Sequence, residues 1–140
     1  MNLDNISRLL RAAAILTGSF VAVTVSSVLE AGGPRLQDFN QLVIYVDYTP
    51  GSLTSADLKF EFAPADAPTD FYQETNESAS VASNVDTRGV NTVIHRLTIA
   101  GKYRFAFPIA DGDVKVSAMG NGTAAGSSMK ITAGLGKTFA

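Results

Sequence analysis

The feature that most constrains this chain is a period-two alternation of apolar and polar residues, repeated in short segments along much of its length. In the clearest case, residues 56–62, three apolar side chains alternate with three charged ones: Leu58, Phe60 and Phe62 against Asp57, Lys59 and Glu61. Successive side chains of a strand point to opposite faces of its sheet, whereas a helix repeats about every 3.6 residues. The alternation therefore predicts strands that each bury one face, here with the charged residues toward solvent.

Similar segments follow one another at spacings of about ten residues, separated by turns rich in Gly, Pro, Asn and Asp. They are Gln41–Tyr48, Ala56–Phe62, Phe71–Gln73, Asn91–Ile99, Lys102–Ile109, Asp113–Met119 and Ser127–Ala133, with a further strand expected within residues 18–29. Gln41–Tyr48 is apolar on both faces in its middle, which predicts a central strand between two layers. The polar stretch Glu74–Arg88 allows either a weak strand at Ala79–Ala82 or a long loop. Seven or eight short strands without a long helical pattern predict an all-β fold, an antiparallel β-sandwich of the jelly-roll type.

Residues 12–29 carry no charge and follow two arginines, an arrangement that resembles a signal peptide or a short membrane span. Asp4 stands where a signal peptide would be basic, and the second half of the segment alternates apolar with small or polar residues. A strand with one buried face is the favoured interpretation. The expectation is therefore a chain with neither leader nor membrane anchor, made in a cytoplasm.

The pattern divides the chain into an N-terminal arm (1–17), a β-sandwich domain (18–133) and a C-terminal tail (134–140). Apolar residues of the arm recur at helical spacing, which allows a short helix over residues 5–14 as an alternative to an extended segment. Either form could lie on its own domain or reach a neighbouring subunit. For the second case, six residues at the two ends are the candidate subunit contacts: Leu3, Ile6, Arg8, Leu10, Arg11 and Phe139. The two arginines would pair with acidic groups of the partner.

The residue inventory excludes several kinds of chemistry. The chain of 140 residues has no cysteine and one histidine, so thiolate metal sites, cysteine nucleophiles and disulfides are impossible. Its 11 basic and 13 acidic residues give a net charge of −2, without the basic stripe of a nucleic-acid-binding protein. We expect no enzyme activity, no cofactor, no metal, no nucleic-acid partner and no membrane association.

Three sets of polar residues could still carry chemistry, and each has a plainer explanation. Asp57 and Glu61 could act as a carboxylate pair, but the lysine between them indicates a solvated polar face. Asp111 and Asp113 could hold calcium, although two aspartates flanking a glycine are more typical of a hairpin turn. His95 lies between apolar residues, which favours a partly buried histidine bonded to backbone or to a hydroxyl over a catalytic base.

The remaining aromatic residues suggest an alternative function. Tyr45, Tyr48 and Tyr72, together with Asp47 and Gln73, could form a site that stacks on a sugar and hydrogen-bonds to it. Jelly rolls also serve as lectin domains. A carbohydrate-binding or host-attachment module of a phage particle is therefore the second hypothesis.

Four stretches resemble small structural proteins of tailed bacteriophages: Leu42–Phe62, Asp70–Thr75, Lys102–Phe105 and Gly120–Ser128. Together with the size of the chain and its strand pattern, they are similar to the jelly-roll cement (decoration) proteins of these phages. The resemblance implies a non-enzymatic virion structural protein that binds the outer capsid surface and bridges neighbouring major capsid subunits. It also implies a homodimer, synthesis in the bacterial host cytoplasm and a final place on the capsid exterior. No catalytic site comes with this family.

Overall fold

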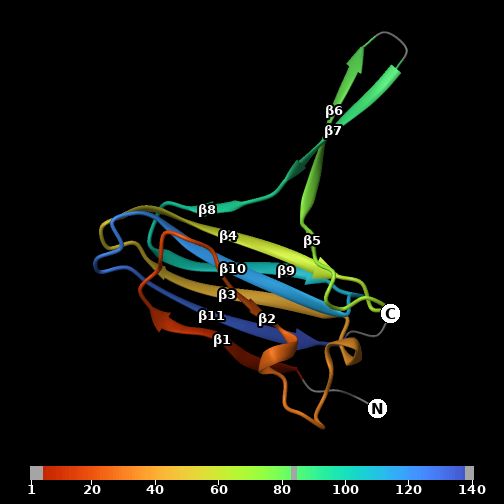
Figure 1. The fold of residues 1–140 in the computed structure, drawn as a ribbon, viewed down its shortest axis with the longest axis horizontal. Coiled ribbons are helices and arrows are strands. Elements are labelled where there is room, and N and C mark those ends of the chain that lie inside the picture. The colour runs from red at the N-terminus through yellow and green to blue at the C-terminus, as the bar shows by residue number, and fades with distance from the viewer. Residues whose placement is uncertain (1–4, 83–84, 138–140) are drawn as a thin grey trace.

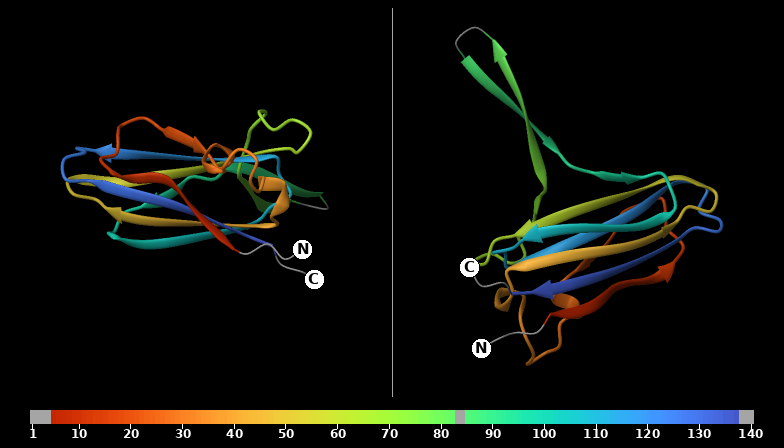
Figure 2. Two further views of the ribbon diagram at one scale, coloured as in Figure 1. Left: turned by 90° about the horizontal axis from the view of Figure 1, so that it is seen from below. Right: turned by 180° about the vertical axis from the view of Figure 1, so that it is seen from behind.

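The fold is described from a computed structural model, which places residues 5–82 and 85–137. These residues contain eleven strands and two short 3₁₀-helices, and the strand pairings are antiparallel (Figure 1). Two of the sheets pack face to face (Figure 2). The predicted all-β antiparallel sandwich is confirmed, with more strands than the expected eight.

Sheet A has the order β1-β11-β3-β9, and sheet B has the order β2-β10-β4, with β5 and β8 both paired to β4. The strands of sheet A are β1 Ile6–Ala14, β11 Ser128–Gly136, β3 Gln41–Thr49 and β9 Gly101–Pro108. Those of sheet B are β2 Val21–Thr24, β10 Asp113–Gly122, β4 Leu53–Ala63, β5 Tyr72–Gln73 and β8 His95–Leu97. The strands β6 Thr75–Ala82 and β7 Val85–Thr92 pair with each other. The 3₁₀-helices η1 Ser26–Val28 and η2 Leu36–Asp38 lie between β2 and β3.

The order of the strands is that of a jelly roll. If β5 and β8 are counted as two halves of one strand, the sandwich has eight strand positions in chain order. The first position pairs with the last, the second with the seventh, the third with the sixth and the fourth with the fifth. The pairs β11·β3 and β10·β4 then join these ribbons into two sheets. The chain is thus one long antiparallel ribbon rolled into a sandwich, which confirms the jelly-roll prediction.

The core lies between the inner faces of sheets A and B. The alternation in β3 and β4 decides which residues enter it: Leu42, Ile44, Val46 and Tyr48 from β3, and Ala56, Leu58 and Phe60 from β4. The prediction that β3 is buried on both faces is wrong, because its other face is exposed or half-buried on the outside of sheet A. β3 does occupy the predicted interior position, between β11 and β9.

The N-terminal segment is extended, and the alternative of a short helix over residues 5–14 is wrong. β1 pairs with β11 along the edge of sheet A, with Ile6 opposite Leu135 and Leu10 buried in the core. An isolated short helix is marginal in water, whereas a strand in this place hydrogen-bonds to the open backbone edge of β11. The segment is therefore the first strand of the jelly roll. At the other end, β11 continues through Gly136, past the expected end of the domain at residue 133.

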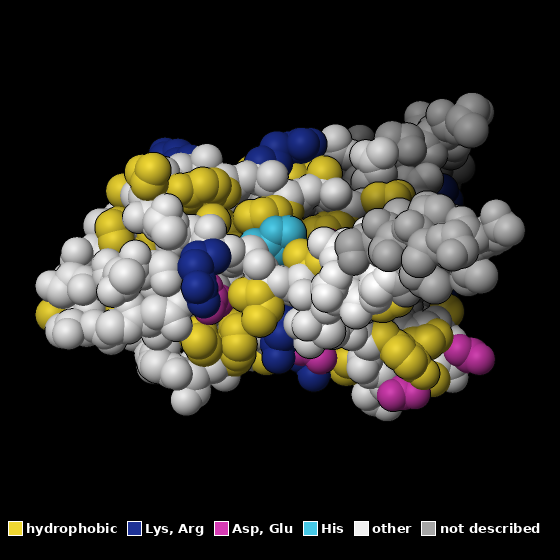
Figure 3. Space-filling model, turned by 90° about the horizontal axis from the view of Figure 1, so that it is seen from above, with side chains coloured by type: hydrophobic (Ala, Val, Ile, Leu, Met, Phe, Trp, Pro, Cys, Tyr) yellow, Lys and Arg dark blue, Asp and Glu magenta, His cyan; other side chains and the backbone are white. Residues whose placement is uncertain are grey.

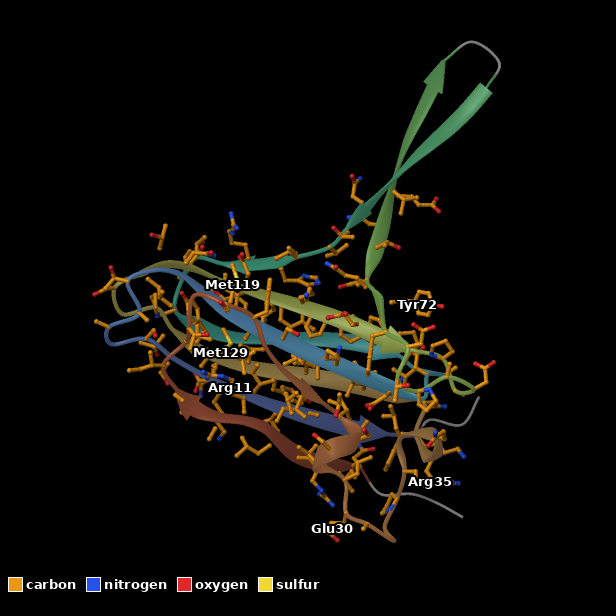
Figure 4. The ribbon with its side chains drawn as sticks, in the orientation of Figure 1. Arg11, Glu30, Arg35, Tyr72, Met119 and Met129 are labelled. Atoms are coloured by element: carbon orange, nitrogen blue, oxygen red, sulfur yellow. The ribbon has the colours of Figure 1, made fainter. Side chains whose placement is uncertain are left out.

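Arg11 fastens the irregular end of β1. The pairing register shifts between Leu9 and Arg11 and again before Ala14. The Arg11 guanidinium donates hydrogen bonds to the backbone carbonyls of Met129, Ala14 (3.0 Å) and Ile15 (2.8 Å). Figure 4 shows Arg11 beside Met129, between β1 and β11. Burial of the guanidinium lowers the pKa of Arg11.

Residues 18–29 form a shorter strand than expected. β2 ends at Thr24, and η1 begins at Ser26, whose backbone N–H (3.1 Å) and hydroxyl both donate to the buried Asp113 carboxylate. Of the alternating valines, Val25 is fully buried and Val21 is exposed. Within residues 5–82 and 85–137, no helix is long and apolar enough to span a bilayer.

The turn between β3 and β4 meets the loop between β10 and β11 at a point with no room for a side chain. Gly51 has a φ of +57°, and a Cβ there would lie 2.3–2.6 Å from backbone atoms of Ala125 and Gly126. The adjacent Ser52 N–H donates to the Ala125 carbonyl at 2.9 Å. This contact holds the two connections together at one end of the sandwich.

Gly51→Ala is expected to lower the free energy of unfolding by about 2 kcal/mol or more, because the backbone must move to admit the methyl group. Urea denaturation followed by circular dichroism measures the change. Gly18→Ala is the matched control, since no atom lies within 4 Å of a Cβ at Gly18. Its effect should stay within about 0.5 kcal/mol. Equal stability of the two variants would contradict the close contact at Gly51.

Tyr48 buries its hydroxyl in the core, where the oxygen has no hydrogen-bond partner among the described residues. Burial, and to a lesser extent Tyr103, raises the pKa of Tyr48. Because an unpaired buried hydroxyl is unfavourable, Tyr48→Phe should leave stability unchanged or raise it by up to about 2 kcal/mol. Tyr48→Ala, which removes the ring, should lose about 3–5 kcal/mol. Calorimetry of both variants tests this, and a clear loss in Tyr48→Phe would reveal a hydrogen bond to the hydroxyl.

Candidate functional site

A two-stranded hairpin, β6–β7, projects from one edge of the sandwich (Figure 1). Its register runs from Thr75 opposite Thr92 to Ala82 opposite Val85. The view from behind in Figure 2 shows it leaving along the plane of the sheets and extending away from them. Sequence reasoning expected a weak strand or a long loop over Glu74–Arg88, and the structure has two paired strands there. We refer to Thr75–Thr92 as the β6–β7 arm.

The β6–β7 arm interrupts a single edge strand of sheet B. On one side of it, β5 lies opposite residues 61–62 of β4, and the Glu74 N–H donates to the Phe60 carbonyl at 3.1 Å. On the other side, β8 continues along the same edge, with His95 opposite Leu58. Glu74 and His95 therefore lie two register positions apart along β4, although the whole arm separates them in sequence. The arm is an insertion into a strand that would otherwise run continuously beside β4.

Glu74 and His95 close the base of the arm. His95 Nε2 and Glu74 Oε1 are 2.8 Å apart, and the Val93 N–H donates to the Glu74 carbonyl at 2.9 Å. The imidazole packs at steep angles against Phe60 and Phe105, with ring centroids 5.3 and 5.0 Å away. The predicted partly buried, hydrogen-bonded histidine is confirmed, although its partner is a carboxylate rather than backbone or a hydroxyl. These contacts set the point at which the arm leaves the sandwich.

Exposed apolar side chains lie on the arm, at its base and past the far end of β8. Val90 on the arm is 64% exposed, Ile99 between β8 and β9 is 71% exposed, and Ile94 at the base is exposed as well. Figure 3 looks down on this side, where hydrophobic side chains gather around the histidine. A two-stranded hairpin is marginally stable in water by itself, and clustered apolar exposure is typical of binding surfaces. The arm and its base form the candidate functional site, and they suit binding to another macromolecule.

The candidate carboxylate pair on β4, Asp57 and Glu61, does not converge, because its members lie four residues apart on one strand, about 13 Å. Asp57 is only 2% exposed and accepts hydrogen bonds of 2.9 and 3.1 Å from Arg96 of β8. These bonds lower the pKa of Asp57, burial opposes the shift, and a hydrogen bond with Asn121 adds to it. Glu61 lies 3.6 Å from Lys59. The prediction of a solvated face is wrong for Asp57, because β8 places Arg96 directly over it.

Asp111 and Asp113 also take separate roles. Asp113 is buried and, besides its two bonds with Ser26, accepts a hydrogen bond from the Val114 N–H at 2.8 Å. Burial raises the pKa of Asp111, and a backbone hydrogen bond partly opposes the shift. In the part of the chain that the structure describes, no three His, Asp or Glu side chains are grouped so that they could hold a metal ion.

The five residues of the carbohydrate hypothesis are dispersed over the molecule. Tyr45 and Asp47 are exposed on the outside of sheet A, and Tyr48 is buried in the core. Tyr72 and Gln73 lie on β5, at the edge of sheet B. The tyrosines therefore form no common stacking surface.

A depression of about 730 Å³ lies at the end of the sandwich between residues 29–37 and the Pro68–Thr69 turn. Most of its lining is glycine, proline and aliphatic side chains, and its charged members are Glu30, Arg35 and Asp113. Figure 4 shows Glu30 and Arg35 at separate points of the connection between β2 and β3. Asp113 is already engaged by Ser26. The charged groups are thus spread around the depression.

The candidate subunit contacts at the chain ends fall partly inside the protein's own fold. Two pack against the core and one binds carbonyls of its own chain: Ile6, Leu10 and Arg11. Arg8 is half-buried on β1 and donates to the preceding carbonyl at 3.0 Å. Leu3 and Phe139 lie outside the described residues. Contact of these residues with a neighbouring subunit stays a prediction.

Sequence reasoning missed the β6–β7 arm. The signal that could have found it is the Ser83-Asn84 dipeptide, whose residue types favour turns, between two segments that contain Thr and Val. The many Ser and Asn residues of these segments weakened the strand pattern, because such residues are not typical of strands.

Comparison of the chain with protein-family models found no match, and comparison with curated proteins found none either.

Asp57 and Arg96 make the stability of the fold depend on pH. Because the pKa of Asp57 is lower in the folded chain, the pair stabilises the fold above the unfolded pKa of about 3.9. That contribution is lost as the pH falls through the lowered pKa of the folded state. Asp57→Asn should be about 2 kcal/mol less stable than the wild type at pH 7, and the difference should shrink below about pH 4. Urea denaturation at several pH values measures both quantities.

Glu61→Gln is the control for this series, since Glu61 lies on the same strand and makes one longer ion pair. Its effect at pH 7 should stay within about 0.5 kcal/mol. A stability difference between Asp57→Asn and wild type that does not change with pH would contradict the assignment to the carboxylate.

Proposed function

We propose that this chain is a non-enzymatic structural protein that binds neighbouring subunits of a larger protein assembly through the β6–β7 arm. The observation that carries the proposal is the arm itself, a hairpin inserted into an edge strand and held at its base by Glu74 and His95. A strand running continuously beside β4 would complete the jelly roll without it. The arm therefore extends beyond what the sandwich requires, as an element that contacts a partner must.

We take the assembly to be a virion shell, in which the protein acts as a cement (decoration) protein on the capsid exterior. This part of the proposal rests on the resemblance of the phage-like stretches, of which Leu42–Phe62 forms β3 and β4, one interior strand of each sheet. Its partner would be the major capsid protein, which it would meet after synthesis in the bacterial host cytoplasm. A homodimer stays a prediction.

The shape of the molecule supports a bridging role. A sandwich with an element that reaches past its own edge can contact one subunit with the sandwich and the next with the arm (Figure 2). Once one contact has formed, the second becomes intramolecular, so two modest contacts combine into stable binding. Many copies bound in this way would stabilise a shell without any catalysis.

The test deletes the β6–β7 arm and joins β5 and β8 into one continuous strand beside β4. Joining Glu74 directly to Ile94 deletes Thr75–Val93, puts Ile94 opposite Lys59 and leaves His95 opposite Leu58. We expect this variant to fold, with a thermal midpoint within about 5 °C of wild type. It should fail to rebind capsids from which the protein has been stripped. Sedimentation of the mixture measures rebinding, and circular dichroism measures folding.

Two point variants separate the arm from the rest of the surface. Val90→Ser changes an exposed apolar side chain on the arm, and Ile15→Ser changes one next to β1, at the opposite edge. The first should weaken rebinding about tenfold and the second should leave it unchanged. Full rebinding by the deletion variant would show that the arm is not the contact. Absence of the protein from purified virions, measured by mass spectrometry, would overturn the virion assignment.

A further inference from the structure

The outer face of sheet A carries exposed basic side chains around one tyrosine. Tyr45 of β3 lies opposite Arg104 of β9, and two residues further along β3, Asp47 lies between Lys102 of β9 and Lys130 of β11. Tyr45 is 47% exposed, and the four charged side chains are exposed as well. The view from behind in Figure 2 shows this face with no described segment of the chain covering it.

The two outer faces of the sandwich differ in how their charges are paired. On sheet B each cation has a partner: Arg96 binds Asp57, Lys59 lies beside Glu61, and Lys115 lies 4.1 Å from the centre of the Phe71 ring. On sheet A no hydrogen bond or ion pair joins Lys102, Arg104 or Lys130 to another described residue. Three cations against the Asp47 carboxylate give this face a charge of +2. The rest of the chain, whose net charge is −2, then carries −4.

The shape of this face suits a broad contact. Three depressions of about 260, 220 and 390 Å³ lie side by side on it, and Arg104 lines all three. Tyr45 lines two of them, and its ring lies against the sheet, 3.2 Å from where a Cβ of Gly134 would be. A surface with several small depressions around a central arginine and tyrosine is typical of protein interfaces, in which these residue types dominate the binding energy.

We propose that the outer face of sheet A docks an acidic surface of a partner protein, with Arg104 and Tyr45 at the centre of the contact and Lys102 and Lys130 at its rim. The inference goes beyond the proposed function, because it names a second contact surface and the chemistry of its partner. It rests on the proposed function only for the identity of the assembly. Complementary charge at such a face speeds association and selects the orientation of the partner.

This face and the β6–β7 arm point in different directions. The β6–β7 arm leaves the sandwich along the plane of the sheets, whereas the outer face of sheet A points across that plane (Figure 2). The two surfaces therefore meet different neighbours. A protein that binds one neighbour through a charged face and another through an arm has the geometry of a bridge.

The arrangement of charges on this face favours a protein partner over a nucleic acid. Asp47 stands directly between Lys102 and Lys130, where it would repel a phosphate backbone tracking across the two lysines. The net charge of the whole chain also repels a polyanion at long range. A partner surface with a few carboxylates and a cation to meet Asp47 has no such conflict.

The test maps where an acidic peptide binds. The full chain, labelled with ¹⁵N, is titrated at low salt with a decapeptide of glutamates around one central lysine, which would meet Asp47, and is followed by amide chemical shifts. We expect shifts confined to β3, β9 and β11, which vanish as salt is added. The double variant Arg104→Gln/Lys130→Gln should lower the affinity for the peptide at least about tenfold, and Tyr45→Ala should lower it several-fold. Lys115→Gln, a cation on sheet B, is the control and should bind as wild type does.

Shifts that map elsewhere, or no shifts at millimolar peptide, would overturn the proposal. Tighter binding of decathymidylate or polygalacturonate than of the peptide at the same face would also overturn it, in favour of a nucleic acid or an acidic polysaccharide. Because this titration needs no capsids, its result is separate from the rebinding experiment. If the wild-type chain binds the peptide on sheet A but does not rebind stripped capsids, the proposed function is overturned and this inference stands.

Discussion

The open backbone edges of the two sheets are the constraint on which the rest of the structure depends. A strand edge presents unpaired N–H and C=O groups, which must be paired or protected. At β11 the edge is covered by β1, whose irregular end is held by Arg11. At β4 it is covered by β5 and β8, the two halves of one strand. The β6–β7 arm is inserted between these two halves. The element proposed to bind a partner is therefore anchored at the strand that pairs with the edge of β4.

Charge is distributed so that the two outer faces have different properties. On sheet B, β8 brings Arg96 over Asp57, and the carboxylate becomes a buried, paired group that contributes to stability. On the outer face of sheet A, Arg104 of β9 and Lys130 of β11 are exposed, and no hydrogen bond or ion pair joins them to another described residue. The cations on the outer face of sheet B are thus paired within the chain, whereas those on the outer face of sheet A are exposed to a neighbouring protein.

Much of the fold could be predicted from local pattern. The alternation in β3, β4 and β9 identifies these strands, and the turn residues between segments set their number near that of the eight jelly-roll positions. The candidate site could be predicted only in part. His95 was expected to be partly buried and hydrogen-bonded, but its partner Glu74 lies on the far side of the arm in sequence. The arm itself has a weak strand pattern, because its pairing is made by the backbone and its side chains are largely small and polar.

By itself, the sequence determined that the chain is all-β and which face of its strongest strands is buried, because the period of a strand is a local property of a few consecutive residues. Only the tertiary structure decided which strands are neighbours. The first segment became a strand rather than a helix because β11 offered it an edge, and Asp57 became buried because Arg96, 39 residues away, lies opposite it. Such pairings depend on competition among all the edges of the chain, and no short stretch of sequence contains that information.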